Sequence, residues 1–122
     1  MINFVFTFKS NSPLIIPEEY PEVLKYEGNF SIEIDNKVFF HEADFSIFEF
    51  LLYTDKWKTL DCDMLYDCID TDDNPLISFI KNGELFYVNS PWSLFECKQG
   101  FTKKELLEKI DNMKSNIIEQ CY

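Results

Sequence analysis

The alternation of apolar and polar residues near the N-terminus predicts a β-strand. Residues 2–8 place an apolar side chain at every second position, which is the period of a strand with one buried face. Those positions are Ile2, Phe4, Phe6 and Phe8. Residues 9–28 lose this periodicity and contain three prolines, so we expect a long connection along the surface. Leu14, Ile15 and Ile16 are expected to attach this connection to the core.

A hairpin and then a helix are predicted in the next segment. Residues 30–34 alternate between apolar and polar, Asn36-Lys37 supplies the turn, and residues 38–41 return as the second strand. The apolar period then changes to that of a helix over about residues 45–56, with Glu49 near its first turn. Its main apolar positions are Phe45, Phe48, Leu51, Leu52 and Trp57.

Residues 60–69 fit two structures. Leu60, Cys62, Met64, Tyr66 and Cys68 occupy alternate positions, as in a strand. Several apolar residues of the same segment also satisfy helical spacing, and aspartate is unfavourable in the interior of either element. We favour the strand, because residues 72–75 then form a turn into the following strand.

The last third of the chain carries clearer signals. Asn82-Gly83 is a strong hairpin turn between strands at residues 76–81 and 84–89, and residues 92–97 are expected to form a last strand. Thr102 followed by Glu105 is a capping box that opens a helix over about residues 102–119. The sequence therefore predicts one α+β domain over residues 1–122. Its mainly antiparallel sheet has about five to seven strands and is covered by the two helices, at about 45–56 and 102–119.

Composition agrees with a folded protein. The 122 residues are 46% hydrophobic and 17% aromatic, with three glycines, so large rings are expected to fill the core. The chain begins without a basic signal region and has no apolar run of membrane-spanning length, which favours a cytoplasmic protein without a membrane partner. Its four cysteines are then expected to be reduced.

Negative charge is the most distinctive feature of the composition. The net charge is −11, the chain has no arginine, and residues 59–100 contain eight acidic residues and two lysines. Six aspartates fall within thirteen residues: Asp61, Asp63, Asp67, Asp70, Asp72 and Asp73. Such a field repels nucleic acid and speeds association with basic proteins. A basic protein partner is therefore the first hypothesis, and direct nucleic-acid binding is disfavoured.

Enzymatic and metal-dependent functions find little support. His41, the single histidine, precedes Glu42 and Asp44, which leaves a hydrolase using His41 as a minor alternative. No nucleophile motif or phosphate-binding glycine loop is present, so we expect no catalytic residues and no cofactor. Residues 70–74 resemble the start of a calcium-binding loop, but Pro75 and Lys81 occupy its glycine and glutamate positions. No metal site is predicted.

The aspartate cluster has two interpretations that the sequence leaves open. In a strand at 60–69, Asp61, Asp63 and Asp67 would share a face with apolar Leu65 and Ile69, as at a protein interface. Alternatively, the carboxylates only keep an aromatic-rich protein soluble. The candidate partner-binding residues are Asp61, Asp63, Asp67, Asp70, Asp72 and Asp73, with Tyr66 and Trp92 as possible anchors.

Several short motifs resemble a family of small, uncharacterised bacterial domains. They are the segments 30–35 and 39–42, the stretch from Glu49-Phe50-Leu51 to Trp57, Asn74-Pro75-Leu76, and Ser90-Pro91-Trp92 before the capped C-terminal helix. The overall type is also similar to immunity proteins of bacterial toxin–immunity and contact-dependent inhibition systems. That resemblance implies an acidic, cytoplasmic α+β protein that binds and neutralises a cognate toxin, often a basic nuclease. The alternative is a binding or regulatory domain with a different partner.

Overall fold

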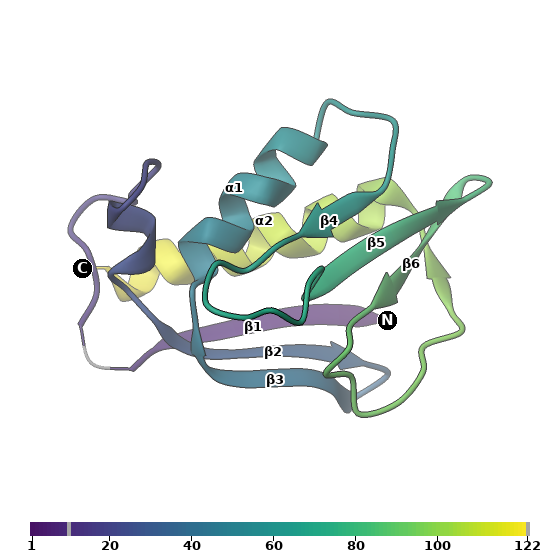
Figure 1. The fold of residues 1–122 in the computed structure, drawn as a ribbon, viewed down its shortest axis with the longest axis horizontal. Coiled ribbons are helices and arrows are strands. Elements are labelled where there is room, and N and C mark those ends of the chain that lie inside the picture. The colour runs from purple at the N-terminus through teal and green to yellow at the C-terminus, as the bar shows by residue number, and fades with distance from the viewer. Residues whose placement is uncertain (10, 122) are drawn as a thin grey trace.

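Two antiparallel sheets and two α-helices form the fold in a computed structural model, which describes residues 1–9 and 11–121 (Figure 1). The first sheet has the order β1-β2-β3, with β1 Ile2–Phe8, β2 Gly28–Ile34 and β3 Lys37–Phe45. The second has the order β4-β5-β6-β7, with β4 Met64–Tyr66, β5 Ile77–Asn82, β6 Leu85–Asn89 and β7 Gly100–Phe101. The helices are α1, Ile47–Trp57, and α2, Lys103–Gln120, and a short 3-10 helix, η1, covers Glu22–Leu24. The predicted α+β class is confirmed, with the strands divided between two sheets.

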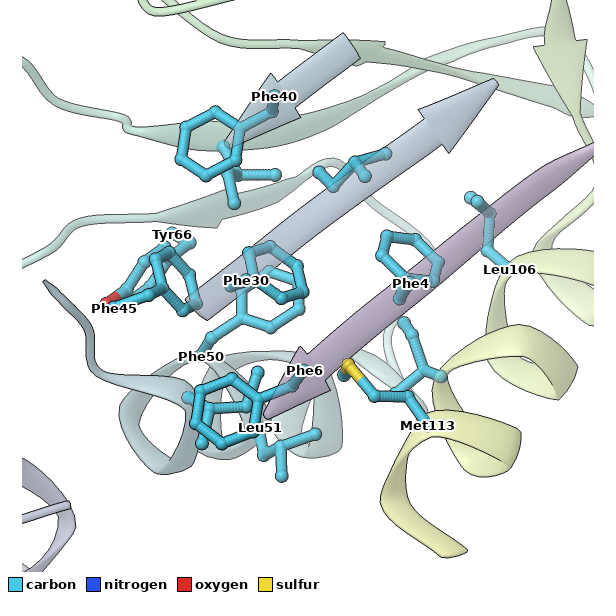
Figure 2. Packing of buried hydrophobic residues seen from close by; sticks show 14 of the residues in the cluster. Phe4, Phe6, Phe30, Phe40, Phe45, Phe50, Leu51, Tyr66, Leu106 and Met113 are labelled. Atoms are coloured by element: carbon cyan, nitrogen blue, oxygen red, sulfur yellow. The ribbon is translucent and has the colours of Figure 1, made fainter. Parts of the chain in front are cut away.

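Aromatic rings from both sheets and from α1 meet in the core. Phe30 of β2 stacks on Phe45 with ring centroids 4.3 Å apart, and Phe50 of α1 contacts Tyr66 of β4 at 5.4 Å. Figure 2 shows these four rings together, with Met113 and Leu106 of α2 approaching from the side of β1. Burial of large rings supplies most of the apolar driving force in a chain of this size.

Both helices begin and end close to where the sequence places them. Thr102 caps α2 because its hydroxyl accepts a 3.1 Å hydrogen bond from the Glu105 amide. The inward face of α2 carries Leu106, Ile110, Met113 and Ile117, all buried against the core. Neither helix of the described residues combines the length and apolar character that a membrane-spanning helix requires.

The hairpins form at the predicted places, with each turn displaced by one residue. Asp35 and Asn36 form the first turn with φ of 51° and 67°, and Lys37 already belongs to β3. In the second hairpin Asn82 pairs with Leu85, so the turn lies at Gly83-Glu84, where Gly83 has a φ of 69°. Asparagine, aspartate and glycine tolerate positive φ, which is why neighbouring choices of turn position look similar in sequence.

Two expectations about connecting segments are wrong. Residues 92–97 form turns and irregular structure, and the last strand is β7, nearer to α2. In this segment the Leu94 amide donates one 2.8 Å hydrogen bond to the Phe39 carbonyl. Leu14 and Ile15 are each 84% exposed, so within residues 14–16 only the half-buried Ile16 packs against the core.

The ambiguous segment at 60–69 contains a strand of three residues. Met64 and Tyr66 of β4, followed by Cys68, point inward, while Asp63, Leu65 and Asp67 are exposed. The alternation predicted from the sequence is therefore present over residues 63–68. Cys62, expected on the inward face, is exposed because the strand begins only at Met64.

Candidate functional site

Two of the six clustered aspartates contact a lysine from another strand. Lys81 of β5 forms an ion pair with Asp61 at 2.7 Å, and its backbone amide donates a 2.7 Å hydrogen bond to Asp63. The Lys81 ammonium lowers the pKa of Asp61 through this hydrogen bond and its charge. Asp61 and Asp63 thus hold the residues just before β4 against β5, and the Lys81 ammonium partly neutralises the charge of Asp61.

The other four aspartates lie in or beside the loop between β4 and β5. The side chain of Asn74 organises this loop, accepting a 2.8 Å hydrogen bond from the Cys68 amide and donating to the carbonyls of Cys68 and Thr71. The Thr71 hydroxyl also accepts from the Asp73 amide at 3.1 Å. These side chains satisfy backbone groups that no strand pairs, as asparagine and threonine commonly do in turns. The exposed carboxylates are Asp67, Asp70, Asp72 and Asp73.

Beside this loop, acidic residues of β3 complete a pocket of about 180 Å³. We call it the acidic pocket; its lining residues are Glu42, Asp44, Phe45, Cys68, Asp70, Thr71, Leu76 and Trp92. The volume is below the roughly 300–1,000 Å³ of small-molecule sites, so it suits one side chain of a partner. A second, shallower hollow of about 450 Å³ is lined by residues 69–73 alone.

The carboxylates around the acidic pocket influence one another electrostatically. Burial, followed by the nearby Asp44 and Asp70 carboxylates, raises the pKa of Glu27, and Glu42 adds to the effect. Lys9 opposes it and forms a 2.6 Å ion pair with Asp44. Both partners of this pair are more than half exposed, so it contributes little to stability. The pocket therefore keeps a net negative charge.

Trp92 is positioned at the pocket by contacts on two sides. Its ring stacks on Phe40 of β3, with centroids 6.4 Å apart and an interplanar angle of 4°. Its indole N–H donates a 2.8 Å hydrogen bond to Asp73. The side chain is half-buried and lines the acidic pocket, so the structure brings Trp92 together with Asp70 and Asp73.

Tyr66, the other expected anchor, is fully buried and is not part of the surface. Its hydroxyl donates a 2.8 Å hydrogen bond to the carboxylate of Glu49, which is 1% exposed. Tyr20 donates to the same carboxylate at 2.6 Å, and the Ile69 amide lies 3.4 Å from it. Burial raises the pKa of Tyr66 and of Tyr20, with Glu49 reinforcing the shift, so both hydroxyls remain donors. Glu49 thus holds the start of the loop between β4 and β5.

Sequence reasoning assigned no such role to Glu49, to Glu27 just before β2, or to Glu42 and Asp44 of β3. Glu49 carried a signal, since Phe45 and Tyr53 lie one helical turn on either side of it and place it on the apolar face of α1. A carboxylate on that face requires hydrogen-bond donors when the helix is buried. Glu27, Glu42 and Asp44 carried no such signal, because only the folded sheet brings them to the loop.

The minor chemical candidates occupy separate positions. His41 is exposed on β3, and its Nδ1 lies 2.9 Å from the hydroxyl of Ser31, its cross-strand neighbour. The four cysteines are free thiols. No group of three or more histidine, cysteine, aspartate or glutamate residues is placed to hold a metal ion within residues 1–9 and 11–121. The acidic pocket is therefore the best candidate site. Its carboxylates and the Trp92 ring could together bind a cationic group.

Comparison with known proteins identifies the family to which the chain belongs. No curated protein and no solved structure shows significant similarity to the chain. A family described as a domain of unknown function, DUF7878, matches residues 4–120. This match extends from β1 to the end of α2 and includes every residue of the acidic pocket. The chain therefore belongs to the DUF7878 family.

Proposed function

We propose that the protein is an immunity-type inhibitor that binds a basic protein toxin stoichiometrically through its acidic pocket and the adjoining loop. One observation carries this proposal: carboxylates from separate segments surround a pocket of side-chain size. Glu42 and Asp44 come from β3, and Asp70 comes from the loop between β4 and β5. Trp92 supplies an aromatic surface beside them.

A lysine or arginine side chain is the chemical group that this pocket suits best. Its charged end would be attracted by the Asp44 and Asp70 carboxylates, and its aliphatic part would contact Phe45 and Trp92. Insertion of one anchoring side chain into a pocket with a polar rim is a common source of affinity at protein interfaces. Asp72 and Asp73 extend the negative surface around the pocket.

Competition for basic residues would explain inhibition. A nuclease holds the phosphates of its substrate with lysine and arginine side chains, and these groups would meet the carboxylates of the acidic pocket instead. The inhibitor needs no catalytic residue for this mechanism. Long-range attraction would also speed association, typically by about 10- to 1,000-fold, and this gain would fall as salt screens the charges.

The direct test is co-expression with the protein encoded by the neighbouring gene, followed by co-purification and measurement of affinity. The variant D70N/D72N removes two charges from the loop while preserving side-chain shape. Its matched control is E108Q/E119Q, which removes two exposed charges from α2. We expect the loop variant to weaken binding at least about ten-fold, mainly through slower association, and the control to change affinity less than two-fold.

Equal effects of the two variants would mean that total charge alone matters, and the acidic pocket would lose its role. A neighbouring-gene product that binds without being inhibited would support the alternative of a regulatory partner. Growth of the host with the co-expressed toxin distinguishes these cases, because neutralisation protects the cells and mere binding does not.

A further inference from the structure

The connection between β1 and β2 contains two exposed apolar residues, which we call the apolar tip. Leu14 and Ile15 are adjacent in sequence, and each is 84% exposed. A single exposed aliphatic residue is ordinary, but contiguous apolar surface on a folded protein commonly marks an interaction site. The tip is therefore a candidate contact surface, separate from the acidic pocket.

Contacts on both sides of the tip hold it in place. The Ser12 hydroxyl donates a 3.3 Å hydrogen bond to the Gln120 carbonyl at the end of α2. On the other side, Tyr20 donates to Glu49, and the Glu19 carbonyl accepts from the Val23 amide at 3.0 Å. The backbone of residues 13–18 is thus fixed at its ends, which positions Leu14 and Ile15 outward.

Residues 16–18 lie between two hollows, which together we call the apolar groove. The first, about 210 Å³, is lined by Ile16, Pro17, Glu18, Phe48, Leu51, Leu52, Asp55 and Lys114. The second, about 510 Å³, is lined by Ile15, Ile16, Pro17, Glu18, Glu19, Glu22 and Tyr26. The first hollow presents aliphatic and aromatic side chains of α1 and offers room for one apolar side chain of a partner.

Charge around the apolar groove selects the chemistry of its occupant. Four acidic residues line the groove, namely Glu18, Glu19, Glu22 and Asp55, against one lysine, Lys114. Lys25 and Lys58 reach Glu22 and Asp55 from outside, at 2.8 and 3.6 Å, which leaves Glu18 and Glu19 as the main negative charges. A second copy of this chain, with a net charge of −11, would bring like charge to the same rim.

We propose that the apolar groove binds a basic amphipathic helix of a partner protein. One apolar side chain of the helix enters the 210 Å³ hollow against Leu51 and Leu52, and its neighbours contact Ile15. Lysines or arginines flanking that stripe face Glu18 and Glu19. Amphipathic helices bind apolar grooves in this manner, with anchors one helical turn apart. No residue that lines the apolar groove also lines the acidic pocket, so this contact does not depend on the proposed function.

The test uses a synthetic helix of about 18 residues, built from leucine and lysine with one apolar face, since shorter helices are marginal alone. Titration into the ¹⁵N-labelled protein is followed by NMR. We expect saturable shifts of the amides of Ile15, Ile16, Glu18 and Leu52. The variant L14S/I15S should weaken binding by roughly five-fold or more, as loss of an apolar contact does at interfaces.

Two controls separate groove binding from simple attraction of opposite charges. The variant Leu94→Ser changes an apolar residue that is 68% exposed elsewhere on the surface and should leave affinity unchanged. A scrambled peptide of the same composition, without an apolar face, should bind more weakly. Shifts confined to the acidic pocket, equal binding of the scrambled peptide, or unchanged affinity of L14S/I15S would each overturn the proposal.

Discussion

The β4–β5 loop and the β1–β2 connection are both attached to the carboxylate of Glu49, yet they expose different chemistry. The β4–β5 loop contacts it through the Ile69 amide and exposes aspartates. The β1–β2 connection contacts it through the Tyr20 hydroxyl and exposes Leu14 and Ile15. One buried group therefore positions both candidate surfaces.

The two segments differ in whether solubility alone accounts for their exposed side chains. Exposed carboxylates such as Asp70 and Asp72 also serve solubility, so their presence alone identifies no partner. Exposed Leu14 and Ile15 serve no such purpose, and their position is fixed by hydrogen bonds on either side. Partner binding is therefore supported by the pocket in the case of the aspartates, and by the exposure itself in the case of Leu14 and Ile15.

The largest expected effect comes from removing the shared carboxylate. Glu49→Ala leaves the buried Tyr66 hydroxyl without its acceptor and releases Tyr20 and Ile69. We expect the free energy of unfolding to fall by about 3 kcal/mol in urea denaturation, because buried polar groups lose charge-assisted hydrogen bonds. Amide hydrogen exchange should accelerate in both loops.

Glu49→Gln is the control, since the amide keeps one acceptor oxygen and the side-chain shape. It should cost about 1 kcal/mol. If Glu49→Ala changed exchange in only one of the two loops, the common attachment at Glu49 would be wrong.

The second effect should be confined to the β4–β5 loop. Asn74→Ala removes one acceptor and two donors that hold residues 68–71. We expect a loss of about 1–2 kcal/mol in the free energy of unfolding. Hydrogen exchange should rise at Cys68 and its neighbours while Val23 and Leu24 stay protected. Faster exchange at Val23 would show that the two loops are coupled more tightly than their contacts indicate.

Local signals in the sequence were sufficient for most of the fold. Period-two alternation gave the strands of the first hairpin, the Asn82-Gly83 turn signal gave those of the second, and the Thr102 capping box gave the start of α2. Where two adjacent residues tolerate positive φ, as at Asp35 and Asn36, local preference could not choose the turn to within one residue. The strand predicted at residues 92–97 is wrong because this segment lies beside β3 through two separate contacts, the hydrogen bond from the Leu94 amide to the Phe39 carbonyl and the Phe95 ring against Phe39, and pairs in no β-ladder.

The candidate site was harder to predict from the sequence. Contacts between residues far apart in the chain decide which acidic residues line the pocket. Asp61 and Asp63 are held by Lys81 and do not line the acidic pocket, whereas β3 contributes Glu42 and Asp44 to its lining. Neither the contacts of Lys81 nor the contribution of β3 can be predicted from residues adjacent in the sequence. Trp92 and Asp73, both predicted to bind a partner, do lie side by side. Tyr66, predicted as an anchor, is buried and cannot contact a partner, and its alternation with Leu65 already indicated an inward position.

The third effect is a pH-dependent gain in stability at Glu27, which the Asp44 and Asp70 carboxylates of the acidic pocket influence. Burial and neighbouring carboxylates raise the pKa of Glu27 above its ordinary value of 4.5. Its favourable contribution to stability is thus complete below that value and is lost as the pH rises through the raised pKa. Glu27→Gln should then be more stable than the parent at pH 7 by less than about 1 kcal/mol, with no gain near pH 4. Thermal unfolding at the two pH values measures this, and a gain of equal size at both would contradict the electrostatic cause.

The smallest expected effect distinguishes the apolar tip from a structural element. Leu14 and Ile15 are 84% exposed, so L14S/I15S should change the free energy of unfolding by less than about 0.5 kcal/mol. Ile16→Ser, next to them, removes a half-buried side chain from the core's edge and should cost more, about 1 kcal/mol. Parallel urea denaturation of the two variants makes the comparison. A large loss in L14S/I15S would mean that the tip packs against the protein in solution, and the apolar groove would then be occupied by the chain's own residues.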